Sequence, residues 1–191
     1  MQVFETKRLY IKKAEATEKD IENYYRLWNS GEVMKMVGFP EGLGISRQEI
    51  HEQFEKLGKT EFDSCLAVHR KEDDKFIGEC KLGLPNEKHI STTDVKLLSE
   101  FWGNNYGKEI KAALCDYLFT KTDCKIVEAS PNKLNLASQK MQKYCGGKIV
   151  REELFEAPKN SKVVRTDVKS YIYHIKKEDF YDKTTKKEES K

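Results

Sequence analysis

Apolar residues recur along this chain at two spacings, one typical of strands and one typical of helices. Alternation at every second position indicates a strand, and recurrence at every third and fourth position indicates an amphipathic helix. Seven stretches have the pattern of strands: residues 7–14, 62–70, 75–84, 89–98, 125–129, 148–155 and 168–175. Four stretches have the pattern of helices, and they begin near residues 17, 46, 105 and 135. The order β α α β β β α β α β β predicts an α/β fold in which helices cover the faces of one sheet.

Short capping motifs support the starts of the first two helices. Thr17 with Asp20, and Ser46 with Glu49, fit the pattern in which a hydroxyl and a carboxylate cap each other's free N–H groups. Asn135 begins the last predicted helix, which ends at the glycine pair 146–147. The inner face of that helix is expected to carry mainly apolar side chains: Leu134, Ala137, Met141 and Tyr144 or Cys145.

The most informative stretch is residues 95–109, in which a buried strand leads through a polar loop into a helix. The loop contains the sequence GNNYG at residues 103–107. Glycine adopts positive φ angles without strain, and asparagine is among the few other residues that tolerate them. Such a loop can direct backbone N–H groups toward one point at the positive end of the helix, where they would hold a phosphate or pyrophosphate. An ordinary turn between a strand and a helix is the alternative interpretation.

Length and charge limit the classes of function. A chain of 191 residues is enough for one domain, expected over residues 1–182, and the Lys/Glu-rich residues 183–191 are expected to be a disordered tail. The chain has 35 basic and 32 acidic residues, for a net charge of +3. This near balance argues against a dedicated nucleic-acid-binding protein, which concentrates basic charge.

Cysteine usage and hydropathy indicate a cytoplasmic protein. The five cysteines are odd in number, and none forms a C-x-x-C pair. Reduced thiols in a cytosol are therefore expected, with neither a disulfide framework nor a metal site. No apolar run approaches the ~20 residues that a membrane-spanning helix needs, so no membrane partner is expected.

The order of elements and two motifs together resemble the GNAT superfamily of acyl-CoA-dependent N-acyltransferases. The motifs are the loop EFWGNNYGKE and, about thirty residues later, NLASQKMQKYCGG. Within the superfamily, the chain most resembles the ribosomal-protein N-terminal alanine acetyltransferases. The matching residues, in order, are Glu100, Phe101, Trp102, Gly103, Tyr106, Gly107, Glu109, Asn135, Ser138 and Gly146. The resemblance extends over roughly residues 7–175.

The resemblance implies a mixed, mostly antiparallel sheet and a single co-substrate, acetyl-CoA. It implies that the backbone of residues 95–99 pairs with the pantetheine arm, and that residues 102–108 surround the pyrophosphate. The implied cofactor-binding residues are Val95, Lys96, Leu97, Leu98, Ser99, Trp102, Gly103, Asn104, Asn105, Tyr106, Gly107, Lys108, Asn135 and Ser138. The acetyl group would pass directly to a primary amine in a ternary complex, the amine being that of a protein N-terminus or a small molecule.

Three positions depart from the family pattern. Asn105 stands where the family usually has glycine, and Lys108 where it has Thr or Ser. Gln142 stands where many members carry a tyrosine that acts as the acid. Ser138 is then the better candidate for proton donation to the thiolate. The missing tyrosine leaves open a second function, that of a non-catalytic acyl-CoA-binding or sensor domain.

The general base and the acceptor site are the least determined parts. Asp94, Glu100 and Glu79 are candidate bases, although each is also a plausible solvated carboxylate. The acceptor is expected to bind at the two N-terminal helices and the loop between them, residues 36–45, with Trp28, Phe39 and Glu79 as its contacts, while Trp28 also fits a core position. Neither the acceptor amine nor the choice between monomer and homodimer follows from the sequence.

Overall fold

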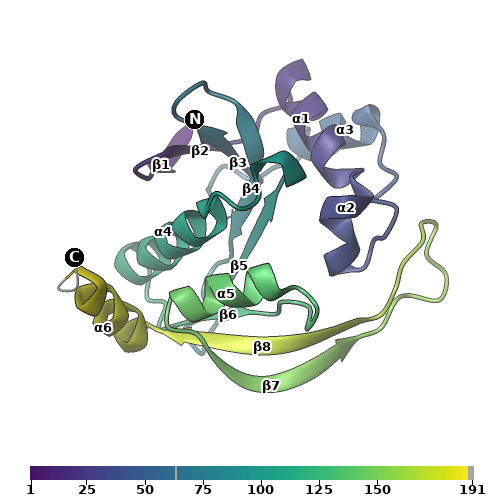
Figure 1. Ribbon diagram of the computed structural model, residues 1–191. Coiled ribbons are helices and arrows are strands. Elements are labelled where there is room, and N and C mark those ends of the chain that lie inside the picture. The colour runs from purple at the N-terminus through teal and green to yellow at the C-terminus, as the bar shows by residue number, and fades with distance from the viewer. Residues whose placement is uncertain (63, 189–191) are drawn as a thin grey trace.

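Eight strands form one sheet in the order β1-β2-β3-β4-β5-β6-β8-β7. The computed structural model of the chain describes residues 1–62 and 64–188, and Figure 1 shows their arrangement. The strands are β1 (Gln2–Glu5), β2 (Leu9–Lys13), β3 (Leu66–Arg70), β4 (Phe76–Leu82), β5 (Ile90–Leu97), β6 (Ile126–Ala129), β7 (Lys148–Phe155) and β8 (Val168–Lys176). Every neighbouring pair is antiparallel except β5 and β6, which are parallel. The expected mixed, mostly antiparallel sheet with flanking helices is confirmed.

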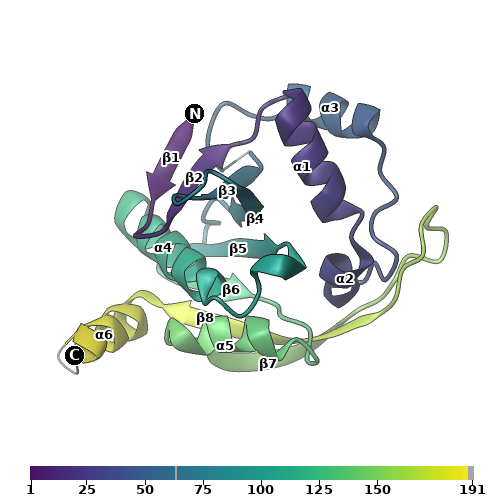
Figure 2. The same cartoon turned by 45° about the horizontal axis from the view of Figure 1, so that its top comes forward.

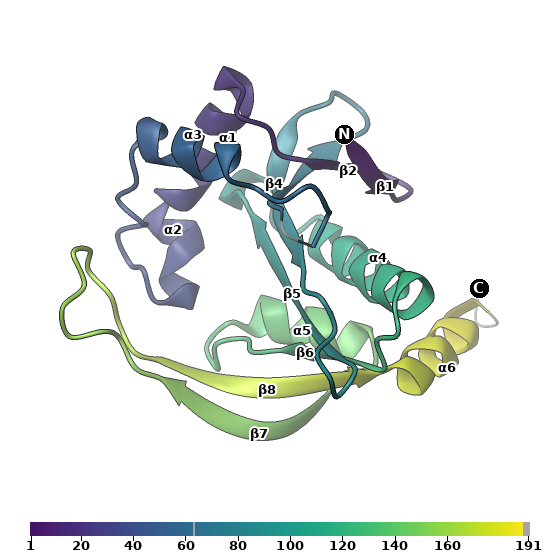
Figure 3. The same cartoon turned by 180° about the vertical axis from the view of Figure 1, so that it is seen from behind.

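Helices cover both faces of the sheet. They are α1 (Glu18–Trp28), α2 (Gly31–Met34), α3 (Arg47–Glu55), α4 (Tyr106–Lys121), α5 (Leu136–Tyr144) and α6 (Lys177–Glu188), with short 3₁₀ turns η1 (Lys35–Val37) and η2 (Ser99–Phe101). Figures 1 and 3 show α1, α2 and α3 grouped together, away from α4 and α6. Alternating side chains of β3 point to opposite faces: Ala67 packs with α1 and α3, whereas Leu66 and Val68 pack with α4.

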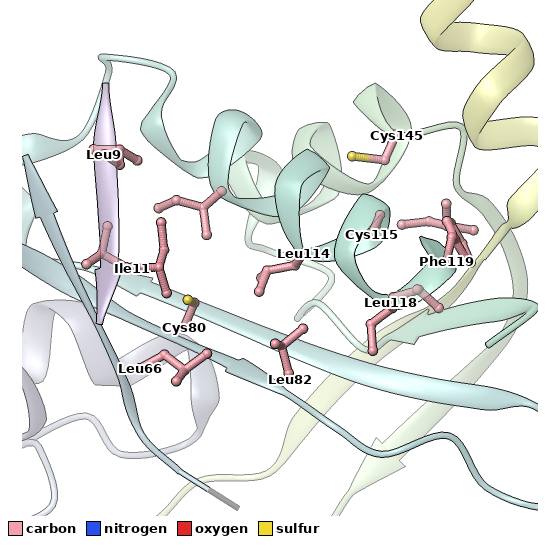
Figure 4. Close-up of a cluster of buried hydrophobic side chains, with 14 of the residues drawn as sticks. Leu9, Ile11, Leu66, Cys80, Leu82, Leu114, Cys115, Leu118, Phe119 and Cys145 are labelled. Carbon is pink, nitrogen blue, oxygen red and sulfur yellow. The ribbon is translucent and has the colours of Figure 1, made fainter. Parts of the chain in front are cut away.

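The larger core lies between the sheet and α4. Its side chains come from β2, β3 and β4 on one side and from α4 on the other, as the labelled residues of Figure 4 show. Leu114, Cys115 and Leu118 of α4 are fully buried there. These contacts fix the axis of α4, and thereby the position of its first turn, against the sheet.

Both predicted capping motifs start helices, with one difference between them. Ser46 and Glu49 cap each other reciprocally at the start of α3. Thr17 Oγ1 accepts from the Asp20 N–H at 3.3 Å, but the Asp20 carboxylate accepts from the Glu15 N–H at 2.9 Å rather than from Thr17. The Asp20 carboxylate therefore fixes the chain that enters α1 instead of completing a reciprocal cap with Thr17.

Three elements are absent from the predicted order: β1, α2 and α6. β1 has too few residues for alternation to identify it, and it forms by pairing with β2. Lys177–Glu188 forms α6, so the helix continues through residues 183–188 of the tail that was expected to be disordered. Lysine and glutamate are good helix formers, which explains a helix where apolar content is low. Residues 189–191 lie outside the described part of the chain.

Phe180 anchors α6 to the core, and this anchor yields a stability prediction. Its side chain is 6% exposed, and its ring centroid lies 5.6 Å from that of Phe119. Phe180→Ala should reduce the free energy of unfolding by about 3 kcal/mol, equivalent to roughly 6–12 °C in Tm. Removing residues 183–191 should shift Tm much less. Thermal unfolding followed by circular dichroism measures both, and equal losses would contradict the assignment of the anchor to Phe180.

Candidate active site

Strand β5 pairs with different strands along its two halves. Its register with β4 covers residues 93–97, whereas its register with β6 covers Ile90, Ser91 and Thr92 and ends there. Beyond Thr92 the two parallel strands separate, so the β6-side edge of residues 93–97 is left without a strand partner. Backbone groups along such an edge can pair with an extended ligand as an added strand would. The opening lies in the middle of the sheet, next to the loop that precedes α4.

The N-terminus of α4 has no side-chain cap. Thr17, Ser30, Ser46 and Asn135 cap the first turns of α1, α2, α3 and α5. At α4 the N-cap residue is Asn105, and its side chain makes no capping hydrogen bond. Its Oδ1 instead accepts from Lys108 Nζ at 3.0 Å. The first N–H groups of α4 are therefore available to an anion at the positive end of the helix dipole.

The backbone of Asn105 has the left-handed conformation predicted from sequence. Its φ of 61° and ψ of 12° lie in a region that asparagine tolerates and β-branched residues avoid. Gly107, in the first turn of α4, also lies against α5. A Cβ there would come within 2.5 Å of Met141 Sδ, so the glycine allows α4 and α5 to approach closely.

The loop before α4 is held from both sides. Trp102 Nε1 donates to the Leu97 carbonyl at 2.8 Å, which fixes the loop to the end of β5. Glu109, one turn into α4, accepts from Thr6 Oγ1 at 2.6 Å and from Arg8 Nε at 2.7 Å. The hairpin of β1 and β2 therefore holds the first turn of α4 in place.

A cavity of about 1270 Å³ joins the opening of the sheet to the N-terminus of α4. Most of the predicted cofactor-binding residues line it: Val95, Lys96, Leu97, Trp102, Gly103, Asn105, Tyr106, Gly107, Lys108, Asn135 and Ser138. The other three, Leu98, Ser99 and Asn104, are not among its lining residues. Leu98 is buried against α1 and α3, and Asn104 Nδ2 donates to the carbonyls of Phe101 and Trp102. Figure 2 shows α4 and α5 side by side next to the end of β5.

Helix α5 faces inward partly with polar side chains, which corrects part of the predicted apolar face. Cys145 is buried as predicted, but Gln139 and Gln142 are buried too, whereas Leu134 is 78% exposed and Tyr144 38% exposed. The two glutamines are accommodated inside because each donates to a backbone carbonyl. Gln139 Nε2 donates to Lys133 O at 2.8 Å and Gln142 Nε2 to Ser138 O at 3.2 Å.

Gln142 leaves one polar atom buried beside the cavity. Its Oε1 has no hydrogen-bond partner among the described residues. Ser138 lines the same cavity one turn earlier on α5, and its N–H donates to Asn135 Oδ1 at 2.9 Å. Ser138 and Gln142 are thus adjacent on the helix face toward the cavity, which is where the resemblance places the acid.

A charged network joins β4, β5 and α1 beneath the cavity. Glu79 is 1% exposed, and its Oε1 accepts from Trp28 Nε1 at 3.1 Å and from Lys96 Nζ at 3.1 Å. Lys96 also forms an ion pair with Asp94, which lines the cavity. Burial lowers the pKa of Lys96, but the two carboxylates more than offset it and hold this pKa above its usual value. Burial raises the pKa of Asp94, yet the Lys96 charge and hydrogen bond bring it below its ordinary value.

Family membership follows from a comparison of the whole chain. A profile described as "Acetyltransferase (GNAT) domain" matches residues 8–148. The chain belongs to the GNAT acetyltransferase family. Membership confirms the resemblance and identifies the chain as an acetyl-CoA-dependent N-acetyltransferase. No curated protein sequence matches it.

Solved structures of GNAT acetyltransferases share its fold. A GNAT-family acetyltransferase from Bacillus anthracis superposes with a TM-score of 0.73 at 18% identity, over 93% of this chain and 99% of that one. Spermidine N-acetyltransferase from Vibrio cholerae, solved with CoA and spermine, gives 0.73 at 15% identity, over 91% and 98%. Ribosomal-protein-S5-alanine acetyltransferase from Vibrio fischeri gives 0.71 at 15% identity, over 93% and 97%.

Besides Glu79, which is buried and does not line the cavity, three other residues predicted as catalytic or acceptor-binding lie elsewhere. Glu100 forms an ion pair with Arg26 of α1 at 3.0 Å and does not line the cavity. Trp28 is buried in the smaller core, with its indole N–H directed to Glu79. Phe39 packs under the Arg165 guanidinium, 4.4 Å from its ring centroid. None of the three therefore contacts the cavity that would hold acetyl-CoA.

Part of the cavity wall comes from α2 and η1, of which only residues 36 and 37 belong to the loop predicted to bind the acceptor. Glu32, Val33, Lys35, Met36 and Val37, from α2 and η1, line it. Lys111 of α4 also lines it and is 1% exposed, with Nζ donating to Thr93 Oγ1 at 2.5 Å. The sequence showed only that a lysine, Lys111, lies within the predicted helix. Its side chain points inward because α4 packs on β5.

No helix among the described residues is long and apolar enough to cross a membrane. The same residues contain no group of three or more His, Cys, Asp or Glu side chains able to hold a metal ion.

The buried position of Glu79 makes Lys96 important for stability. Lys96→Met would leave this carboxylate without its counter-charge and should cost about 3–5 kcal/mol. Lys75→Met is the matched control, because Lys75 is 65% exposed and pairs with Asp73 at 3.2 Å. That change should cost less than about 1 kcal/mol. Urea unfolding measures both, and similar costs would show that the Glu79 pair is not the buried interaction described.

The left-handed backbone of Asn105 gives a binding prediction. Asn105→Val places a β-branched side chain at positive φ, at a strain of roughly 1–2 kcal/mol, and should weaken acetyl-CoA binding about tenfold or more. Asn105→Gly also removes the Lys108 contact but keeps the backbone, so its Kd should stay near that of the unaltered protein. Isothermal titration distinguishes them, and equal affinities for both variants would contradict the role of this turn.

Proposed function

We propose that this chain transfers the acetyl group of acetyl-CoA directly to a primary amine while both substrates are bound in one ternary complex. The single observation that carries the proposal is the uncapped N-terminus of α4, which borders a cavity that continues along the half-paired edge of β5. One end of this cavity suits a pyrophosphate and the other an extended pantetheine arm.

Both backbone groups and side chains would contact acetyl-CoA. The N–H groups of residues 103–108 would contact the pyrophosphate, and the backbone of residues 95–97 would pair with the pantetheine amides. Leu134 and Leu136 line the cavity although they are 78% and 65% exposed, which suits contact with an apolar part of a ligand. Asn135 Oδ1 already caps α5, so its amide nitrogen is the group that remains to donate to the pantetheine arm.

Two residues at the cavity fit the required proton transfers. The amine is mostly protonated at neutral pH and must lose a proton before it attacks the thioester carbonyl. Asp94 is ionised there, because Lys96 holds its pKa low, so it would attract the ammonium group and orient the water that takes up its proton. Ser138 would hydrogen-bond the departing thiolate and pass it a proton that its hydroxyl regains from water, with Gln142 standing where a tyrosine would otherwise serve.

The charges that line the cavity favour a protein N-terminus over a polyamine as the acceptor. Its lysines are Lys35, Lys81, Lys96, Lys108, Lys111 and Lys140, against the carboxylates of Glu32 and Asp94 alone. A polycation would meet like charge on most sides, whereas a single α-amine would need only one carboxylate. The ribosomal-protein-S5-alanine acetyltransferase of similar fold acts on such an amine, as its name states.

Turnover on a panel of amines tests the proposal. Thiol release should be fast with peptides that begin with alanine and slow with spermidine. Acetyl-CoA should raise Tm by several degrees, since ligand at a hundred times its Kd adds about 2.7 kcal/mol of stability. A shift in Tm with no turnover on any amine would instead indicate an acyl-CoA-binding domain without catalysis, the function that Gln142 favours.

Ser138→Ala should separate catalysis from binding. If its hydroxyl protonates the thiolate, the change should lower kcat by about 10²-fold while the Kd of acetyl-CoA changes little. Leu136→Ala, on the same helix, is the control, and should weaken acetyl-CoA binding more than it lowers kcat. Steady-state kinetics with titration of acetyl-CoA measure both, and equal losses of kcat and affinity in Ser138→Ala would make Ser138 a binding contact only.

A further inference from the structure

Strand β7 is an exposed sheet edge with apolar side chains. It is the last strand in the sheet order and the outermost strand in Figures 1 and 3. All eight of its residues are exposed, including Ile149, Val150, Leu154 and Phe155, which are 47%, 48%, 47% and 42% exposed. An edge of this kind presents unpaired backbone groups and attracts a further strand.

The sequence of β7 is complementary to itself in one antiparallel register. When two copies of an edge pair about a twofold axis, residues equally distant from the axis face each other on the same face of the sheet. With the axis at Glu152, Arg151 faces the partner's Glu153, and this contact occurs twice, so the register joins opposite charges in pairs. Val150 lies in the bulge between Ile149 and Arg151 and takes no part in the regular register.

Neighbouring registers lack this match. An axis at Arg151 would set that residue against the partner's Arg151. An axis at Glu153 would set it against the partner's Glu153 and Arg151 against the partner's Phe155. In the register about Glu152, the only like charges that face each other are Glu152 and the partner's Glu152. Lys133 Nζ, 2.7 Å from Glu152 Oε2 in the same chain, already neutralises this carboxylate. The bulge between Ile149 and Arg151 confines the regular ladder to the residues around the axis.

We propose that β7 is the interface of a homodimer in which two copies of the chain form one continuous sheet across a twofold axis. The Arg151 guanidinium contacts Glu153 and, across β8, Glu128 of its own chain, each at 3.1 Å, so it turns from Glu128 toward the free edge to reach the partner. Its five N–H donors leave capacity for the partner's Glu153. The opening between β5 and β6 lies inside each subunit, so the proposal is independent of acetyl transfer.

Two opposite charge reversals test the register. In Arg151→Glu the facing pairs become two carboxylates, and in Glu153→Arg they become two guanidinium groups. Each variant alone should dimerise with a Kd about tenfold or more above that of the unaltered protein. An equimolar mixture should form a heterodimer close to the original affinity, because carboxylate then faces guanidinium at both contacts. Sedimentation velocity over a range of concentrations measures all three samples.

The mixture shows whether Arg151 and Glu153 act across the dimer interface or only within one subunit. Contacts between residues 151, 153 and 128 inside a chain are also altered in each variant, but mixing cannot restore them. Arg47→Glu, which breaks the exposed pair with Glu22 on α1, is the control and should leave the dimer unchanged. The proposal is overturned if the unaltered protein stays monomeric at every concentration, if the single variants dimerise as it does, or if the mixture fails to recover.

Discussion

The separation of β5 from β6 after Thr92 is the constraint on which the site depends. β5 must stay paired with β4 to remain part of the sheet, and it must lose β6 to leave backbone groups free for a ligand. The short parallel contact from Ile90 to Thr92 permits both, since it holds the two halves of the sheet together at one end only. The cavity between β5, α4 and α5 follows from that opening.

The cores on the two faces of the sheet support this opening from opposite sides. Packing of Leu114 and Leu118 sets α4 against β2–β4, so the helix dipole is directed at a fixed point. On the other face, Glu79 connects Trp28 of α1 with Lys96 of β5. A buried carboxylate and ammonium are costly to separate, and this cost keeps β5 in register beside the cavity.

Sequence reasoning succeeded where local chemistry decides the structure. The loop before α4 was predictable because glycine and asparagine tolerate the positive φ angles that Gly103 and Asn105 adopt, and because the GNAT motif identified the loop. Capping by Ser46 and Asn135 was predictable for the same reason. Most of the sheet followed from alternation of apolar residues, apart from β1, which is too short to show it.

The parts that failed depend on contacts distant in sequence. Glu100 looked like a cavity carboxylate, but the path of η2 brings it to Arg26 instead. Gln139 and Gln142 were not part of the predicted inner face of α5, because the backbone carbonyls that they bond inside the protein cannot be identified from apolar spacing. Lys111 is buried only because α4 lies across β5, which no local pattern shows.

The contact of Glu109 with Thr6 and Arg8 links the beginning of the chain to the proposed phosphate site about a hundred residues later. Arg8 also donates to the Asn104 carbonyl at 3.1 Å, and its guanidinium stacks 4.4 Å from the Tyr106 ring centroid. These contacts therefore hold the loop before α4 and the β1–β2 hairpin together. A change near the N-terminus, such as a fused affinity tag or proteolytic trimming past Arg8, would therefore alter the affinity for acetyl-CoA although it changes no residue that lines the cavity.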